Sequence, residues 1–392
     1  MENIKQILVL SNRLEMSGGE YVLERTLKSL IKHYHFTILS PDPILLERFQ
    51  RFGCQAYSSK SLSPLSHKPN PLLIRSAYGY VHSLFEIHSV CKKNNIQLII
   101  GNGIGTFLQA ALFTFLARIP AIGIHHHPVN IKKKYLRLGI KFAELLGLKI
   151  ICVSKALREG LINAGIWTGN LVTIHNGLDL SEYKPQRMTA LQGTREIFGV
   201  REDSHIILFP AVIEEWKGQH LIIKALHILK MQNKMSAKTV CIFAGNIYEN
   251  SLIGKEYKQR LLDMIQSYNL ENNFNFVGKL TDMPCAYSAA DIVVSASIDP
   301  EPFGTVLYEA MAMEKLVIAP RHGGNPEIIN DRINGFLFEP GNPHELASLI
   351  SECLYSRNGF AEIRLAARKK VESKFSIVKT AQLYHDYINK HL

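Results

Sequence analysis

The stretch at residues 291–324 reads DIVVSASIDPEPFGTVLYEAMAMEKLVIAPRHGG. Its first apolar run, residues 292–294, ends in small residues, and a helical pattern begins after Gly304. Short, near-continuous apolar runs are typical of strands buried on both faces, which means parallel strands joined by crossover helices. A glycine at a helix start lets backbone N–H groups approach a phosphate, and the helix dipole favours the same ligand. The stretch therefore predicts a parallel α/β sheet with an anion-binding loop at its edge.

The same alternation of strand and helix extends along the rest of the chain. Residues 20–34 carry apolar residues at helical spacing directly after the first predicted strand. The predicted strands are residues 7–10, 36–39, 98–100, 121–124, 150–153, 171–174, 206–209, 240–244, 274–277, 292–294, 316–318 and 336–338. Residues 58–71 are rich in Ser and Pro and predict a loop. Residues 180–203 have no sustained apolar period, so we expect a linker there.

A chain of 392 residues is long enough for two domains of ordinary size. We predict an α/β fold with two doubly wound, Rossmann-like domains, residues 1–180 and 181–374. The last helical stretch, within residues 375–392, can pack back on the first domain. Ligands of open parallel sheets lie beyond the carboxyl ends of the strands. Two such edges facing each other would form a ligand-binding cleft.

Composition and charge limit the kinds of partner. Hydrophobic residues make up 46% of the chain and charged residues 20%, which is typical of a folded protein. Residues 1–180 hold 21 Lys and Arg against 10 Asp and Glu, whereas residues 181–392 hold 24 of each. A basic first half favours anionic partners, although a solubilising surface charge is the alternative. Six scattered Cys without a Cys-x-x-Cys pair favour a reducing compartment, so we expect a cytoplasmic protein.

Two carboxylates flank the loop that precedes the helix. Glu301 lies in the loop, and Glu309 follows about a turn and a half inside the helix. Carboxylates placed in this way can accept hydrogen bonds from two sugars, such as a ribose and a transferred hexose. The alternative is structural: Glu301 caps the helix and Glu309 is exposed.

The segment EPFGTVLYEAMA, with Glu301 and Glu309 as its two acids, resembles the retaining family 4 glycosyltransferases of GT-B fold. A strand and then Gly323-Gly324-x-x-Glu327 follow it, as in that family. Further matches in order and spacing are Gly18-Gly19-Glu20, residues 151–154, residues 172–179, Lys217-Gly218, Ala290-Asp291 and residues 334–336. The Glu-x7-Glu segment in its context is specific, whereas each of the other matches alone is weak.

The resemblance implies a retaining, metal-independent transferase that moves a hexose-type sugar from a nucleotide-sugar. UDP is the commonest nucleotide in the family, and the acceptor would be a hydroxyl of a glycan, a lipid-linked sugar or a small molecule. It also implies that the N-terminal domain binds the acceptor and the C-terminal domain the donor. Glu301 would contact the donor sugar, and Lys217 would neutralise the departing phosphates. The donor-binding residues that it implies are Gly18, Gly19, Val277, Gly278, Lys279, Phe303, Gly304, Thr305, Val306 and Glu309, with Glu309 on the ribose.

One family feature is missing. The family usually has an Arg five residues before the Lys, and here that position is Val212. A lost charge-assisted contact is worth about 1.5–3 kcal/mol. We predict that Arg13 or Arg321 substitutes as the phosphate cation. The missing Arg also keeps open a non-catalytic nucleotide-sugar binder.

Three adjacent histidines, residues 125–127, end a predicted strand. The family has a His at this strand end, near the primary hydroxyl of the transferred sugar, and counting from Pro120 matches it to His126. Because strand side chains alternate, His125 and His127 would point to the opposite face. His125, His127 or a purely structural triplet are the alternatives. Ligands on a strand would need i, i+2 spacing and a third partner, so a metal site is not predicted.

Other motifs narrow the function further. No Asp-x-Asp occurs, so we predict no metal on the diphosphate and no cofactor. Residues 131–149 form a basic amphipathic segment that can lie on anionic lipid, or else pack in the core with a solvated basic face. We find no helix-turn-helix or aromatic-interleaved basic motif, so no nucleic-acid partner is predicted. A sugar-nucleotide epimerase or a phosphorylase on the same scaffold is the remaining alternative.

Overall fold

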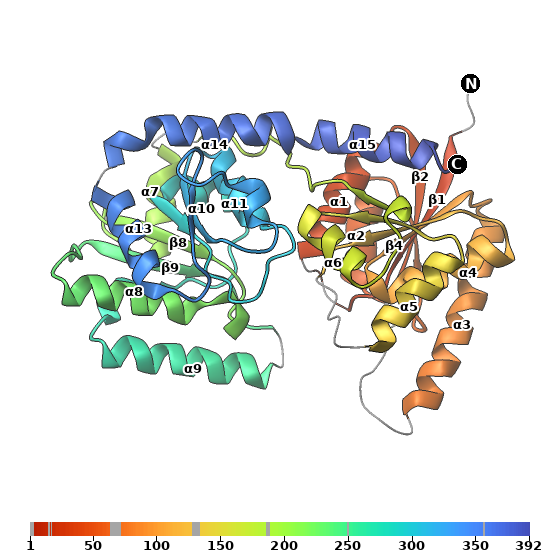
Figure 1. The fold of residues 1–392 in the computed structure, drawn as a ribbon, viewed down its shortest axis with the longest axis horizontal. Coiled ribbons are helices and arrows are strands. Elements are labelled where there is room, and N and C mark those ends of the chain that lie inside the picture. The colour runs from red at the N-terminus through yellow and green to blue at the C-terminus, as the bar shows by residue number, and fades with distance from the viewer. Residues whose placement is uncertain are drawn as a thin grey trace. The chain divides into compact units, whose positions relative to one another are not determined.

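The computed structural model describes residues 4–14, 16, 18–62, 72–127, 134–185, 189–248, 251–355 and 357–392. The chain divides into two compact units. Unit 1 contains residues 1–177 and Ile377–Leu392, and unit 2 is Leu178–Ser376. Each unit is built around one parallel sheet (Figure 1). The division lies within three residues of the predicted boundary, and the last helix belongs to unit 1.

Unit 1 has a seven-stranded parallel sheet in the order β3-β2-β1-β4-β5-β6-β7. Its strands are β1 (Lys5–Ser11), β2 (Tyr34–Ser40), β3 (Gln55–Ser58), β4 (Leu98–Asn102), β5 (Ala121–His125), β6 (Lys149–Cys152) and β7 (Leu171–Thr173). Its α-helices are α1 (Gly18–Leu30), α2 (Pro43–Arg51), α3 (Leu72–Lys93), α4 (Phe107–Leu116), α5 (Lys134–Leu145), α6 (Lys155–Asn163) and α15 (Ile377–Asn389). The strand order reverses between β1 and β4, and ligands of doubly wound sheets bind beside such a switch point.

Helix α15 closes unit 1 by packing on α1. The Tyr34 hydroxyl at the start of β2 donates to Oδ1 of Asn389 (2.9 Å), and the Thr380 hydroxyl donates to the carbonyl of His175 (3.1 Å). Gly177 allows this approach, because a Cβ there would lie 2.8 Å from Cα of Ile377. The C-terminal helix is therefore an integral part of the first unit.

Unit 2 has a six-stranded parallel sheet in the order β10-β9-β8-β11-β12-β13. Its strands are β8 (His205–Pro210), β9 (Thr239–Ala244), β10 (Phe274–Phe276), β11 (Ile292–Val294), β12 (Leu316–Pro320) and β13 (Phe336–Phe338). Its α-helices are α7 (Thr189–Phe198), α8 (Gln219–Met231), α9 (Leu252–Ser267), α10 (Met283–Ala289), α11 (Thr305–Ala312), α12 (Asn325–Ile328), α13 (Pro343–Tyr355) and α14 (Ala361–Lys374). Within this unit α8 and α9 lie along one side of the sheet, and α10, α11 and α14 along the other (Figure 1).

The apolar runs read from the sequence are the centre of both sheets. Every predicted strand is present, and the side chains of β8, β9 and β11–β13 are almost completely enclosed. In unit 2 they join α8 and α13 in one apolar core. Each fully buried large aliphatic or aromatic side chain contributes about 1.5–3 kcal/mol.

Two local expectations were wrong, and one strand was missed. The helix predicted for residues 20–34 ends at Leu30, because Tyr34 already belongs to β2. The predicted linker contains α7, and the edge strand β3 was missed because it is short and half-exposed. The predicted loop at residues 58–71 lies mostly outside the described residues. No helix in the described part of the chain has both the length and the apolarity needed to cross a membrane.

Candidate functional site

The loops at the carboxyl ends of β8 and β11 carry the acidic and basic residues singled out in the sequence. These strands are neighbours in the sheet of unit 2, so their following loops meet at one edge. Glu301 and Glu309 are both 9% exposed, which rules out an exposed Glu309. Helix α11 begins after Gly304, which is its N-cap, so Glu301 does not cap it. The structural alternative for the two acids is therefore wrong.

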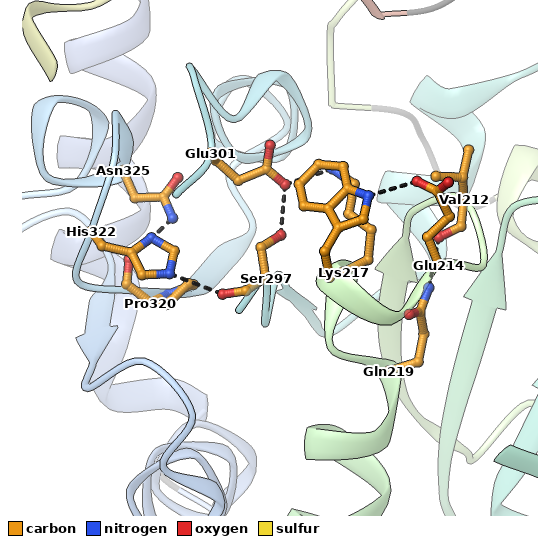
Figure 2. Close-up of polar contacts among 10 residues, drawn as sticks. Val212, Glu214, Lys217, Gln219, Ser297, Glu301, Pro320, His322 and Asn325 are labelled. Atoms are coloured by element: carbon orange, nitrogen blue, oxygen red, sulfur yellow. Dashed lines mark hydrogen bonds and ion pairs between the residues drawn. The ribbon is translucent and has the colours of Figure 1, made fainter. Parts of the chain in front are cut away.

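The carboxylate of Glu301 is held by two donors (Figure 2). Lys217 Nζ and the Ser297 hydroxyl each lie 2.6 Å from Oε1. The Lys217 side chain is 19% exposed, and its Nζ also lies 3.8 Å from the centre of the Trp216 ring. Charge-assisted bonds in a partly desolvated place are stronger than exposed ion pairs. Oε2 of Glu301 makes no hydrogen bond to any residue that the structure describes.

Close backbone packing brings Lys217 to Glu301. The 3₁₀ turn η3 (Glu215–Lys217) ends at Gly218, which has a left-handed φ of 75°. A Cβ on Gly218 would lie 1.9 Å from the carbonyl oxygen of Ala296, so only glycine fits against the loop after β11. The N–H of Ile298 donates to the carbonyl of Trp216 (2.7 Å) and fastens the same two loops.

The Gly323-Gly324 pair supports Glu301 from the other side. A Cβ on Gly323 would lie 2.3 Å from the Glu301 carbonyl oxygen, and Gly323 has a φ of 59°. The N–H of Gly324 donates to that same carbonyl oxygen (2.8 Å). The spacing between the acidic motif and the glycine pair thus reflects direct contact between the loops after β11 and β12.

Glu309 lies inside α11 and accepts a hydrogen bond from the hydroxyl of Tyr287 on α10 (3.0 Å). Tyr287 is fully enclosed, and burial together with the Glu309 charge raises its pKa well above the usual value. The phenol therefore stays protonated and donates. This bond orients the second acid of the motif.

The predicted donor-binding residues of unit 2 also lie at this sheet edge, whereas Gly18 and Gly19 begin α1 in unit 1. Val277 and Gly278 follow β10, and the N–H of Lys279 donates to Oδ1 of Asn246 (3.0 Å). Phe303 is buried, and Thr305 and Val306 form the first turn of α11. First-turn N–H groups have no acceptor within their own helix, so they are available to an anion.

The position that lacks the family arginine is neutral. Val212 uses its carbonyl to accept from Nε2 of Gln219 (2.7 Å). Nearby, Glu214 accepts from Trp216 Nε1 (2.6 Å), and Glu215 pairs with Arg260 (2.9 Å). These acids line a cavity of about 560 Å³.

The two substitute cations that we predicted are both engaged. Arg321 pairs with Asp331 (2.8 Å) and Glu339 (3.3 Å), so its charge is already compensated. Arg13 belongs to unit 1, where it donates to Nε2 of His127 (2.5 Å). These contacts argue against Arg321 as the substitute, whereas the role of Arg13 stays a prediction.

The three histidines of unit 1 have different surroundings. His125 is fully enclosed at the end of β5, near the Phe107 ring, and neither ring nitrogen has a hydrogen-bond partner among the described residues. His126 lies against Gly19, where a Cβ would be 3.4 Å from its ring. Burial lowers the pKa of His125 and His126 to about 3 each, and that of His127 to about 4. His126 is therefore the histidine that meets the Gly18-Gly19 loop.

No group of three or more His, Cys, Asp or Glu is arranged to hold a metal ion in the described part of the chain. The six cysteines are free thiols, and five of them are buried.

A solved structure of similar fold spans the whole chain. HepE (Alr3699) from Anabaena superposes with a TM-score of 0.83 at 24% identity, covering 98% of this chain and 100% of that one. HepE has been solved with UDP, with UDP and glucose, and with UDP-glucose.

Two family models match the two units in turn. Residues 16–182 match the model described as Glycosyltransferase Family 4, and residues 192–370 match Glycosyl transferases group 1. The chain is of the glycosyltransferase family 4 type, with the GT-B fold.

Relatives of this glycosyltransferase type differ in how much of them is matched. The amylovoran biosynthesis glycosyltransferase AmsK of Erwinia amylovora is 25% identical over 86% of this chain and 76% of its own length. Spore coat protein SA of Bacillus subtilis is 27% identical over 54% of this chain. The chain spans 56% of the length of that protein and 64% of the length of YtcC, a further relative from the same organism.

The sequence did not point to several residues that contact the motif residues of this candidate site. Ser297, Tyr287 and Trp216 contact the motif residues from separate loops or helices. A Ser, Tyr or Trp has many uses in a fold, and no local spacing distinguishes these three. The only signal was that Ser297 lies four residues before Glu301 in the loop after a strand.

Proposed function

We propose that the protein is a retaining, metal-independent hexosyltransferase that uses a nucleotide-sugar, with UDP as the nucleotide. The observation that carries the proposal is the buried Glu301–Lys217 pair beside the first turn of α11, with Glu309 deeper in the same helix. HepE, which has this fold, binds UDP and UDP-glucose. The family resemblance supports retention of configuration.

Different site residues would contact different parts of the nucleotide-sugar donor. Lys217 Nζ and the first N–H groups of α11 would stabilise the negative charge that develops on the leaving diphosphate. Oε2 of Glu301, which has no partner among the described residues, would accept a hydroxyl of the transferred sugar. Glu309, oriented by Tyr287, would accept the ribose hydroxyls. No metal is needed in this proposal, because a cation and helix-end amides supply the positive field.

A panel of nucleotide-sugars, measured with EDTA present, tests this function. We expect UDP-hexoses to raise the melting temperature selectively, and Glu301→Gln and Glu309→Gln each to abolish the shift. Glu362→Gln, an exposed acid on α14, is the matched control and should behave as wild type. Unchanged donor binding in both site variants, or binding only with Mg²⁺ added, would refute the proposal. NMR of the product anomer tests retention.

A non-catalytic nucleotide-sugar binder is the second candidate, favoured by Val212 and by two acids in the same loop. Val212→Arg separates the two. If the protein is a transferase, restoring the cation should raise turnover by about 10- to 100-fold, because a charge-assisted contact is worth roughly 1.5–3 kcal/mol. A binder would show tighter donor binding in this variant and no transfer to any acceptor.

We further propose that unit 1 takes the acceptor and attaches to an anionic membrane surface on its cytoplasmic side. Leu138, Phe142 and Leu145 share one face of α5 and are at least half exposed. The end of α4 lies beside them, because Thr114 is 3.1 Å from a Cβ placed on Gly147, and Phe115 and Leu116 are exposed there. Residues 131–133 of the predicted basic segment lie outside the described residues.

A flotation assay with vesicles containing phosphatidylserine tests membrane attachment. We expect wild type to float at low salt and Phe142→Glu/Leu145→Glu to stay in solution. Leu252→Glu/Ile253→Glu changes two exposed apolar residues of unit 2 and is the control. Equal behaviour of both double variants would refute attachment through α5.

A further inference from the structure

A chain of buried hydrogen bonds lies at the carboxyl ends of β4 and β5 in unit 1. Nδ2 of Asn102 donates to Oε1 of Glu20 (3.2 Å), and Nε2 of His126 lies 2.8 Å from Oδ1 of Asn102. Glu20 is 2% exposed, Asn102 3% and His126 7%. They come from the first turn of α1, the end of β4 and the residue after β5, so the fold assembles them from three separate elements.

The polarity of this chain follows from its acidic end. A carboxylate accepts hydrogen bonds and does not donate, so the amide of Asn102 must turn its NH₂ group to Glu20. The amide oxygen then faces His126, and Nε2 must carry the hydrogen. A neutral imidazole has one N–H, so Nδ1 is left as a lone-pair acceptor.

The surroundings keep this ring neutral. Burial, then His127, His125 and Arg13, lower the pKa of His126 to about 3. The ring is therefore not an imidazolium at neutral pH. Nδ1 makes no hydrogen bond to any residue that the structure describes, whereas Nε2 is fully used.

We propose that Glu20 and Asn102 are positioning residues that lock His126 as the Nε2–H tautomer, so that its Nδ1 accepts a hydrogen bond from a sugar hydroxyl. This inference rests on the proposed function and makes it more specific. The lone pair on Nδ1 of His126 would repel a carboxylate. The sugar carbon that faces Nδ1 should therefore carry a free hydroxyl. A neutral hexose therefore fits, and its uronate does not.

Long-range ¹⁵N–¹H NMR of the His126 ring at pH 7.5 tests the tautomer without any substrate. Wild type should show a protonated Nε2 and an unprotonated Nδ1. Glu20→Gln removes the fixed polarity, because a glutamine can donate or accept, and should give a mixture of tautomers. The double variant Glu20→Gln/Asn102→Asp should restore the Nε2–H form, because the new carboxylate accepts from both neighbours.

Ser83→Ala is the matched control. It removes a buried hydroxyl of α3 that accepts a hydrogen bond from Gln109 (3.1 Å) and takes no part in the Glu20–Asn102–His126 hydrogen bonds. The tautomer of the His126 ring should therefore stay as in wild type. A wild-type Nδ1–H ring, or an imidazolium, would overturn the inference, as would an unaltered tautomer in Glu20→Gln. Those results would leave the proposed function intact.

Kinetics test the hydroxyl contact separately. With the nucleotide-hexose selected in the thermal panel, Glu20→Gln should lower kcat/KM by about 3–10-fold, the size expected for one hydrogen bond, and the double variant should recover it. The preference of wild type for the hexose over its uronate should shrink in Glu20→Gln. Tautomer changes without these kinetic changes would overturn the hydroxyl contact. Absence of any turnover in wild type would instead refute the proposed function.

Discussion

The carboxyl ends of the two sheets present different chemistry. In unit 2 the edge carries an ion pair, Lys217 with Glu301, held by glycines that pack on neighbouring carbonyls. In unit 1 the edge ends in a neutral ring, His126, fixed by Asn102. A charged edge suits a ligand that develops charge, such as a diphosphate, whereas a neutral acceptor suits a hydroxyl. The same α/β architecture thus supports two kinds of recognition.

The strongest test of this difference removes the cation of unit 2. Lys217→Met should lower kcat/KM by about 100- to 1000-fold, because one group that stabilises a developing anion is lost. Steady-state kinetics would measure it. Lys224→Met, an exposed lysine on α8, is the control. An equal loss in Arg13→Met would show that both edges share the electrostatic work and would remove the contrast.

The second test concerns how rigidly the charged edge is built. Gly218→Ala should destabilise the protein by about 2–5 kcal/mol, from the left-handed backbone and the clash with the Ala296 carbonyl. Urea unfolding would measure the change. Gly160→Ala, in α6 of unit 1 where a Cβ meets nothing within 4 Å, should be neutral or stabilise by about 0.5–1 kcal/mol. Equal costs would mean that packing does not distinguish these positions.

A third test compares the stability of the two units at low pH. The pKa values of His125 and His126 are lowered from 6.5 to about 3 in the folded state, so the unfolded chain binds more protons between those values. Stability from these residues is complete above about pH 6.5 and falls as the pH is lowered toward 3. Hydrogen exchange, corrected for its intrinsic pH dependence, should show β5 losing protection before β11.

His125→Leu removes one of these titrating groups and should reduce that pH dependence by about 1.4 kcal/mol per pH unit. Unchanged pH dependence in this variant would show that His125 is not the origin of the acid sensitivity.

The smallest expected effect concerns Glu309. Tyr287→Phe removes its hydroxyl donor and should weaken donor binding by roughly 3–10-fold, the value of one hydrogen bond. Calorimetric titration would measure it. Tyr34→Phe, which removes a hydroxyl contact to α15 in unit 1, should cost stability alone. Weaker donor binding in Tyr34→Phe as well would indicate a general loss of structure rather than an orienting role.

Much of the fold was readable because its signals are local. Each predicted strand exists, since a run of apolar residues buried on both faces stands out within three to five positions. Edge strand β3 and helix α7 were not predicted, because partial exposure weakens the apolar pattern of their sequences. The interaction of Arg321 with Asp331 and Glu339 also escaped, because a free arginine and a paired one look the same in the sequence.

By itself, the sequence determined two parallel α/β units and the spacing of Glu301 and Glu309, because strand burial, helix period and motif spacing are properties of short segments. Only the tertiary structure decided which side chains complete the site. Lys217 reaches Glu301 across 84 residues, and Glu20 reaches Asn102 across 82. Such contacts depend on which strands become neighbours in a sheet, and that is settled when the whole core packs.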